Sequence, residues 1–304
     1  MASAVLITGG SGLLALNWAL AIRDRHAVTL GIHERAISLA GVQTLPIDLE
    51  SVDQIVRACK AVRAQTVIHT AGLTSVEKCE AQPEQAQHIN VNLVANVAHA
   101  CAKLDLQLVH ISSDHLFSGD QSLVNEAHPV APRNVYGRTK AESEARVLEI
   151  HPRSLVVRTN FYGWGPRYRR SFSDVVIDAL RSGRELTLFR DVFYTPVLIE
   201  TVARAAHDLI DLNAQGVFHV VGDERISKYE FGRRIAEKFK LDAGLLAPGA
   251  LSDQASLVQR PHDMSLSNQK ARTLLDRKLG GVDEHIARLH QQERDGLAEE
   301  LHSL

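Results

Sequence analysis

Short apolar segments alternate with longer amphipathic segments along the first half of the chain. The apolar segments are rich in β-branched residues, and helix-length stretches fill the gaps between them. Continuous apolar strands separated by helices are typical of a parallel sheet covered on both faces, so the pattern predicts an α/β fold of the Rossmann type, with a doubly wound parallel sheet. The expected strands are AVLIT (4–8), HAVTLGI (26–32), VQTLPID (42–48), TVIHT (66–70), LQLVHIS (106–112) and SLVVRT (154–159).

Two local signals mark the starts of expected helices. Ser51 followed by Gln54 matches the capping-box pattern and opens the segment SVDQIVRACKAV. Pro83 stands where a first-turn proline would begin the segment PEQAQHINVNLVANVAHACAKL. Both segments lie between expected strands, which supports the alternation.

The pattern changes after about residue 160, where longer loops such as WGPRYRRSF appear. We expect a dinucleotide-binding domain over residues 1–160 and, over residues 161–304, mainly a smaller substrate-binding lobe with a C-terminal helix. Later apolar segments such as GVFHVV (216–221) are expected to return to the first domain. From Asp283 on, isoleucine and leucine recur at near-helical intervals, which predicts an amphipathic helix docked on the body, with an interaction helix as the alternative.

Composition narrows the functional classes. Lysine plus arginine number 34 and aspartate plus glutamate 36, so the net charge of -2 provides no basic field for a nucleic acid. Three cysteines without a CxxC pair fit a reducing compartment. The uncharged N-terminal stretch is interrupted by glycine and polar residues at 8–12, so neither a signal nor a membrane anchor is expected. We therefore expect a cytoplasmic protein that binds neither nucleic acid nor membrane.

A glycine-rich turn directly follows the first expected strand. In TGGSGLLA, Gly9, Gly12 and Ala15 recur at intervals of three, and a helical segment follows. Glycine permits a tight turn and lets backbone N–H groups approach a pyrophosphate, while the helix N-terminus offers unsatisfied donors. The turn predicts a dinucleotide site, with a purely structural turn as the alternative. The letters also fit G-x-G-x-x-A from Gly10, so spacing alone does not separate two Rossmann subtypes.

The second expected strand bears on the choice of cofactor. An acidic residue near its end would bind the ribose 2′-hydroxyl of NAD, but Gly31 stands there. His33 and Arg35 follow and offer positive charge to a 2′-phosphate, so the sequence favours NADP(H) over NAD(H). The alternative is that both are solvated loop residues, which the neighbouring Glu34 supports.

Three further groups predict an enzyme. Tyr136 and Lys140 lie four residues apart in a helical segment and so share one helix face, while Ser113 follows the strand LVHIS at the sheet edge where open α/β folds place their chemistry. A hydroxyl there can bind the reacting oxygen, and Tyr136 can give or take its proton. The Lys140 charge is expected to lower the tyrosine pKa from about 10 toward about 7. An exposed tyrosine and lysine on a surface helix is the structural alternative.

In this order the features resemble the extended short-chain dehydrogenase/reductase superfamily, and within it the dTDP-4-dehydrorhamnose reductase family. The resemblance spans about residues 4–275 and rests on TGGSGLLA, HTAGLTSVEKCEAQPEQAQHINVN, HISSDHLFSGD, PRNVYGRTKAESE, VVRTNFYGWG and RPHDMSLSNQKARTLL. It implies an NAD(P)H-dependent reductase that transfers hydride to C4 of a nucleotide-activated 4-keto-6-deoxy sugar, in deoxysugar and cell-surface polysaccharide biosynthesis. It also implies that Tyr136 protonates the new alkoxide, that Lys140 holds the nicotinamide ribose and tunes Tyr136, and that Ser113 supplies the hydroxyl.

The resemblance also assigns residues to the cofactor. These are Gly9, Ser11, Gly12 and Leu13 for the pyrophosphate, Asp48 and Leu49 for the adenine, Ala71 and Gly72 for the ribose and phosphate, and Asn92 on the supporting helix.

On the substrate side, the chain departs from the family at His115, where an aromatic residue is common. We expect this histidine, with Asp114 and Asn160, to lie beside the sugar, although a packed or solvated histidine is the alternative. The basic loop of the second lobe is expected to stack a base and pair a diphosphate through Trp164, Arg167, Arg169, Arg170 and Arg260. An ordinary solvated loop is the alternative.

Two other functions remain open at this point. A nucleotide-sugar epimerase or dehydratase of the same superfamily would need a second acid/base residue, for which His115 and Asp114 are the candidates. The second open function is a non-catalytic, regulatory one, because the regulatory subunit of methionine adenosyltransferase also resembles this reductase family. Scattered histidines without H-E-x-x-H predict no metal site. A homodimer is possible, and the nucleotide and the sugar's stereochemistry do not follow from the sequence.

Overall fold

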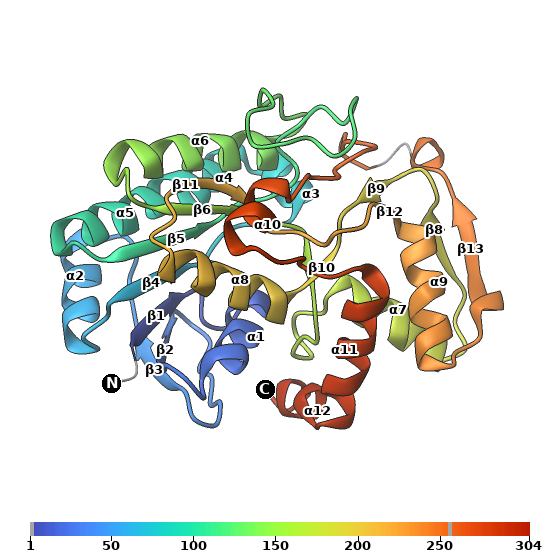
Figure 1. Ribbon diagram of the computed structural model, residues 1–304, viewed down its shortest axis with the longest axis horizontal. Helices are drawn as coiled ribbons and strands as arrows, with labels where there is room; N and C mark the ends of the chain where they lie inside the picture. The colour runs from blue at the N-terminus through green and yellow to red at the C-terminus, as the bar shows by residue number, and fades with distance from the viewer. Residues whose placement is uncertain (1–2, 255–256) are drawn as a thin grey trace.

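The computed structural model describes residues 3–254 and 257–304 and has a seven-stranded parallel sheet in the order β11-β6-β5-β4-β1-β2-β3 (Figure 1). Strand order reverses between β1 and β4, as in doubly wound folds, so the expected fold class is confirmed. The strands are β1 (Ala4–Thr8), β2 (Ala27–Ile32), β3 (Gln43–Pro46), β4 (Thr66–His69), β5 (Gln107–Ile111), β6 (Leu155–Arg158) and β11 (Gly216–His219).

Helices cover both faces of the sheet because successive strand residues point to opposite sides. In β1, Val5 and Ile7 belong to the core shared with α1 and α8, whereas Leu6 belongs to the core shared with α2, α5 and α6. These helices are α1 (Leu13–Ile22), α2 (Val52–Ala61), α5 (Leu93–Leu104), α6 (Val135–Ile150) and α8 (Ile199–Asp211).

Both expected helix starts are confirmed. The Ser51 hydroxyl accepts a hydrogen bond from the Gln54 backbone N–H, and Pro83 lies in the first turn of α4. The expected single helix from Pro83 is, however, three pieces: α4 (Pro83–Gln87), a π-helical turn (His88–Asn92) and α5. A π-helical turn changes the direction of its side chains relative to the flanking helix. The short α3 (Val76–Ala81) precedes them.

A smaller lobe lies at one end of the sheet (Figure 1). Its strand pairs are β8 (Leu186–Phe189) with β13 (Leu246–Gly249) and β9 (Phe193–Tyr194) with β12 (Ile226–Ser227), and its helices are α7 (Phe172–Arg181) and α9 (Lys228–Phe239). The pair of β7 (Phe161–Tyr162) and β10 (Val197–Leu198) leads between lobe and sheet. Short 3-10 turns occur at Ala243–Leu245 and Leu251–Asp253.

Later parts of the chain return to the sheet, as expected. The strand β11 pairs with β6, and α8 packs against α1. The helix α10 (Gln269–Leu275) contacts α8 and β11. The chain after residue 160 therefore contributes to both parts of the molecule.

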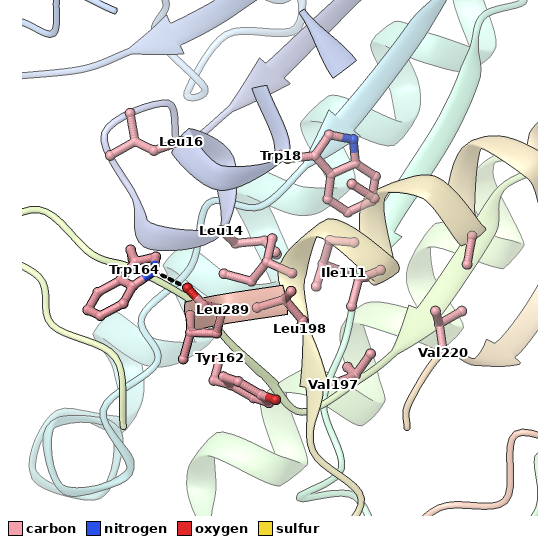
Figure 2. Packing of buried hydrophobic residues seen from close by; sticks show 14 of the residues in the cluster. Leu14, Leu16, Trp18, Ile111, Tyr162, Trp164, Val197, Leu198, Val220 and Leu289 are labelled. Atoms are coloured by element: carbon pink, nitrogen blue, oxygen red, sulfur yellow. Dashed lines mark hydrogen bonds between the residues drawn. The ribbon is translucent and has the colours of Figure 1, made fainter. Parts of the chain in front are cut away.

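The tail is docked on the body, but as two helices. The helices α11 (Val282–Arg294) and α12 (Leu297–His302) are separated at Gly296, whose φ of +84° suits glycine. Ile286, Leu289 and Leu301 are buried in the main core. That core also holds Trp18 of α1 and Trp164 of the loop after β7, so it joins the sheet to the second lobe (Figure 2). Within the described ranges, no helix combines the length and the apolar character needed to cross a bilayer.

Candidate active site

A cavity of about 720 Å³ opens at the carboxyl ends of β1, β4 and β5. Gly9 has a φ of +71°, and a Cβ atom there would lie 2.8 Å from the Ala71 backbone, so the turn requires glycine. Gly12 is the N-cap of α1, whose first turn faces the cavity. The cavity is lined by the expected pyrophosphate and ribose residues Gly9, Ser11, Gly12, Leu13, Ala71 and Gly72.

A second hollow of about 360 Å³ shares Gly9, Ser11 and Ala71 with the first, so the two adjoin at these residues. Its lining is largely apolar and includes Leu49, together with Asp48, both expected at the adenine. The Asp48 carboxylate accepts hydrogen bonds from the Glu50 backbone N–H and the Gln54 side chain, and these bonds hold the Asp48 side chain in place. The order of apolar hollow, glycine turn and helix N-terminus suits the adenine and pyrophosphate of a dinucleotide.

Arg35 is a solvent-exposed residue beside the main cavity. It lines the main cavity and, with Ser11, His33 and Glu34, a shallow hollow of about 570 Å³. Its guanidinium stacks 3.8 Å from the ring centroid of Tyr168, whose hydroxyl donates to the Ser11 carbonyl. Arg35 and His33 are both exposed, but His33, with 80% of its side chain accessible, lies only 3.8 Å from Glu34. Arg35 is therefore the ordered cation at this position.

Tyr136 and Lys140 both line the main cavity from α6. The helix begins after Asn134, whose side chain accepts from the Gly137 N–H, and this cap fixes the first turn that carries Tyr136. The Lys140 ammonium donates to the Ile111 carbonyl at 2.8 Å and lies 3.4 Å from Nε2 of His110. The helix thus delivers a phenol and an ammonium group to one cavity, as the sequence predicts.

The expected effect of Lys140 on Tyr136 is wrong for this structure. Burial raises the pKa of Tyr136 to about 12, while a hydrogen bond with Ser113 lowers it by less. Burial also lowers the pKa of Lys140 to about 8. The Lys140 ammonium is directed to the end of β5, which explains why desolvation outweighs any attraction to a phenolate. Tyr136 is therefore a protonated phenol at neutral pH.

Two adjacent serines follow β5 with different surroundings. Ser113, the predicted hydroxyl, bonds with Tyr136 and donates to Asp114, and it accepts from the His115 N–H. Ser112 lines the main cavity, and its buried hydroxyl has no hydrogen-bond partner among the described residues. An unpaired buried hydroxyl is costly, so Ser112 is suited to bind a ligand there.

Three other residues expected at the substrate, Asp114, His115 and Asn160, follow the ends of β5 and β6. The Asn160 amide donates to the Asp114 carboxylate, and the His115 ring packs edge-on against Tyr136 with the ring centroids 5.5 Å apart. Burial lowers the pKa of His115, so the imidazole is neutral at pH 7. Arg260 lies near enough for its charge to lower that pKa further, and it pairs with Glu77.

Comparison with known proteins agrees with this site. The model of the RmlD substrate binding domain matches residues 3–294. The chain belongs to this family. Curated relatives include the dTDP-4-dehydrorhamnose reductase of Escherichia coli K12, which is 26% identical over 234 residues, covering 73% of the chain and 78% of the relative.

Two other curated relatives are named for different roles. The probable low-salt glycan biosynthesis reductase Agl14 of Haloferax volcanii is 27% identical over 260 residues, covering 84% of the chain and 86% of the relative. The methionine adenosyltransferase 2 subunit beta of Pongo abelii is 30% identical over 280 residues, covering 89% of the chain and 82% of the relative.

A solved structure of the dTDP-4-dehydrorhamnose reductase of Bacillus anthracis, in complex with NADP, has the same fold with a TM-score of 0.85 and 23% identity, covering 96% of this chain and all of that one. Together the matches confirm the resemblance to the dTDP-4-dehydrorhamnose reductase family and place this RmlD-family chain among the NAD(P)-dependent oxidoreductases.

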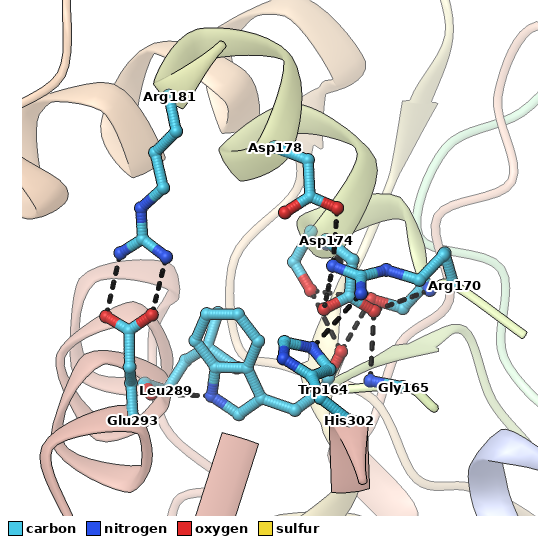
Figure 3. A network of polar contacts seen from close by, with 12 residues as sticks. Trp164, Gly165, Arg170, Asp174, Asp178, Arg181, Leu289, Glu293 and His302 are labelled. Carbon is cyan, nitrogen blue, oxygen red and sulfur yellow. Dashed lines mark hydrogen bonds and ion pairs between the residues drawn. The ribbon is translucent and has the colours of Figure 1, made fainter. Parts of the chain in front are cut away.

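The expected role of Trp164 in stacking a substrate base is wrong. Its side chain is fully buried and its indole N–H donates to the Leu289 carbonyl of α11. Figure 3 shows it inside a polar network in which Asp174 of α7 accepts from the Gly165 N–H and Arg170 contacts Asp178. Trp164 therefore anchors the loop that carries Tyr168 to the cavity, and its own side chain does not line that cavity.

Replacing Trp164 tests this structural role. Trp164→Ala leaves a large buried void and an unpaired carbonyl, so we expect a loss of about 3–5 kcal/mol in the free energy of unfolding. The milder Trp164→Phe should lose less stability and keep the KM for the substrate. Chemical denaturation and initial-rate kinetics measure both. A large rise in KM for the phenylalanine variant at unchanged stability would restore the stacking role.

Six further expected residues line none of the described hollows: Ser113, Asp114, His115, Asn160, Asn92 and Arg167. Asn92 is exposed on the π-helical turn, because the extra residue in that turn rotates it away from the sheet. Asn90 lines the main cavity instead, and its amide bonds with Leu73 and Thr139. Arg167 is exposed and lines none of the described hollows, whereas its neighbours Arg169 and Arg170 line the main cavity.

Several lining residues escaped the sequence reasoning, above all Thr70, Asn90 and Tyr168. Thr70 could have been identified from the sequence, because it follows β4 and directly precedes the predicted ribose residues. Tyr168 lies in a loop whose path no local pattern fixes. In residues 3–254 and 257–304, no group of three or more metal-ligating side chains is close enough to hold a metal ion.

Proposed function

We propose that this protein is an NADPH-dependent reductase of a nucleotide-activated 4-keto-6-deoxy sugar, acting in deoxysugar biosynthesis in the cytoplasm. The main support is that Tyr136 and Lys140 line the same cavity as the glycine turn. The reductase relatives named above favour the same substrate class. A homodimer stays a prediction.

In this proposal the residues beside the substrate's carbonyl group have different roles in the reaction. Bound NADPH supplies the hydride that reduces the carbonyl carbon. The Ser113 and Tyr136 hydroxyls hold the carbonyl oxygen, and Tyr136 donates its proton as negative charge develops there. A pKa of about 12 keeps Tyr136 protonated and therefore ready to act as an acid. Lys140, which lines the same cavity, would hold the nicotinamide ribose.

The preference for NADPH rests on Arg35, the ordered cation at the edge of the glycine turn. We expect Arg35→Ala to raise the KM for NADPH about tenfold and to change the KM for NADH little, since only NADPH carries the 2′-phosphate. His33→Ala, at an exposed site, is the matched control and should have a smaller effect. Equal losses with both cofactors would mean that Arg35 acts only by holding Tyr168.

Oxidation of NADPH and of NADH, followed against a small panel of 4-ketosugar nucleotides, tests the function itself. The proposal expects stoichiometric cofactor oxidation with at least one dTDP-, GDP-, CDP- or UDP-linked ketosugar. Product formation without net cofactor consumption would instead indicate an epimerase or dehydratase that returns the hydride.

A regulatory role is the second candidate, favoured by the methionine adenosyltransferase 2 subunit beta at 30% identity. Stable co-purification with a catalytic partner, together with no turnover on any ketosugar nucleotide, would support it. The oriented Tyr136 and Lys140 favour catalysis over this reading.

A further inference from the structure

Two buried histidines lie side by side on β4 and β5, and one of them contacts the active-site lysine. His69 and His110 are partners in the strand register, and their ring centroids are 5.7 Å apart. Burial lowers the pKa of His69 to about 3 and that of His110 well below its usual value, so both imidazoles are neutral at pH 7. The proposed reaction gives neither of them a role.

The hydrogen bonds of Ser143 in α6 determine which nitrogen of His110 carries the proton. The Ser143 hydroxyl donates its only hydrogen to the Lys140 carbonyl at 2.8 Å. Its oxygen lies 2.9 Å from Nε2 of His110, so Nε2 must be the donor in this contact. Nδ1 is then the unprotonated nitrogen, which agrees with its lack of a hydrogen-bond partner within residues 3–254 and 257–304. The neutral ring therefore has its N–H at Nε2.

This tautomer of His110 is unfavourable for a charged Lys140. The Lys140 nitrogen lies 3.4 Å from the same Nε2 atom, so the ammonium faces an N–H donor where an unprotonated nitrogen would be an acceptor. The ammonium does donate to the Ile111 carbonyl at 2.8 Å. A neutral amine, in contrast, has a lone pair that can accept a hydrogen bond from Nε2–H. The contact with His110 therefore favours the neutral amine over the ammonium.

The other titratable groups around Lys140 offset this effect only in part. Glu144, one turn further along α6, raises the pKa of Lys140, but Arg158 of β6 donates hydrogen bonds of 2.7 to 3.1 Å to its carboxylate. Tyr136 is a protonated phenol and His69 a neutral imidazole at neutral pH. Burial has the largest effect and lowers the pKa of Lys140 to about 8.

We propose that His110 is a positioning residue: with its Nε2–H bound to Ser143, it favours the neutral form of Lys140 and so sets the upper pH limit of the reaction. This inference rests on the proposed function, in which the charged Lys140 holds the nicotinamide ribose. His110 and Ser143 are fully buried and do not line the main cavity, so they act through Lys140. Without the Ser143 hydroxyl, either tautomer of His110 leaves one N–H unpaired, and only the tautomer with an unprotonated Nε2 gains a hydrogen bond from the ammonium.

Ser143→Ala tests the inference through the pH profile of kcat. We expect the fall of kcat at high pH to move upward by about one pH unit, because an acceptor for the ammonium favours the charged form of Lys140. Ser143→Thr keeps the hydroxyl and should retain the parent's profile. Ser154→Ala is the matched control, because it removes another buried serine hydroxyl just before β6, outside the main cavity. An unchanged profile in Ser143→Ala would overturn the inference.

Nuclear magnetic resonance gives a second readout that requires no turnover. In the parent at pH 7, nitrogen chemical shifts of His110, assigned by their loss in His110→Gln, should show the proton on Nε2, and a proton on Nδ1 would overturn the inference. A higher Lys140 pKa in Ser143→Ala, without reduction of any ketosugar by the parent, would support the inference and contradict only the proposed reaction. Reduction by the parent, with equal Lys140 pKa values in parent and Ser143→Ala, would support the function and overturn the role of His110.

Discussion

Tyr136→Phe is expected to lower kcat by roughly several hundredfold or more while leaving the Kd for NADPH nearly unchanged. The substitution removes only the hydroxyl that we assign to proton donation, and general acid catalysis contributes roughly 10²–10⁴-fold in rate. The aromatic ring and its edge-on contact with His115 remain, so the cavity keeps its shape. Kinetics and cofactor titration therefore separate chemistry from binding.

Tyr229→Phe in α9 serves as the matched control, because Tyr229 is a partly buried tyrosine outside the main cavity. Its kcat should equal that of the parent. Full activity of Tyr136→Phe would refute the assignment of Tyr136. A parallel loss of NADPH binding would mean instead that the hydroxyl supports the cofactor.

The fold was predictable because its main elements follow local periodicity. The six strands expected in the first half lie within one or two residues of their observed ends, since each is an apolar run bounded by turn residues. The two-residue pairs β7–β10 and β9–β12 were not predictable, because each joins segments that are far apart in the sequence. The π-helical turn before α5 likewise depends on packing that no spacing reveals.

The site was predictable where function requires a backbone shape or a fixed spacing. Gly9 and Gly12 at the turn and Tyr136 with Lys140 on α6 are of this kind. Predictions based on chemical type alone were less accurate. Trp164 is in the core and Asn92 faces solvent, whereas Asn90, two positions earlier, lines the cavity. The direction of a loop or helix face decides these cases. The pKa of Tyr136 was misjudged because charge was considered without burial.

Lys140→Met is expected to reduce kcat/KM by about a hundredfold or more without destabilising the cofactor-free protein. In the proposed function the lost ammonium holds the nicotinamide ribose in the cavity, and a preorganised charge at such a site contributes several kcal/mol. In the folded protein its pKa falls from 10.5 to about 8, which corresponds to a folding cost on the order of 3 kcal/mol at neutral pH. Methionine removes that cost but also the hydrogen bond to the Ile111 carbonyl, so the melting temperature should stay level or rise.

The pKa of Lys140 also determines how stability and kcat should change with pH. Because the pKa of Lys140 is lower in the folded than in the unfolded chain, the unfolded chain binds more protons between about pH 8 and 10.5, and stability due to this group rises with pH across that window. Burial lowers the pKa of Lys228 in the same way in parent and variant, so the difference between their unfolding curves isolates Lys140. The parent's kcat should fall as pH rises through about 8 and the ammonium is lost, whereas Lys140→Met should show no such fall. A destabilised variant with parental activity would mean that Lys140 is a structural residue of α6.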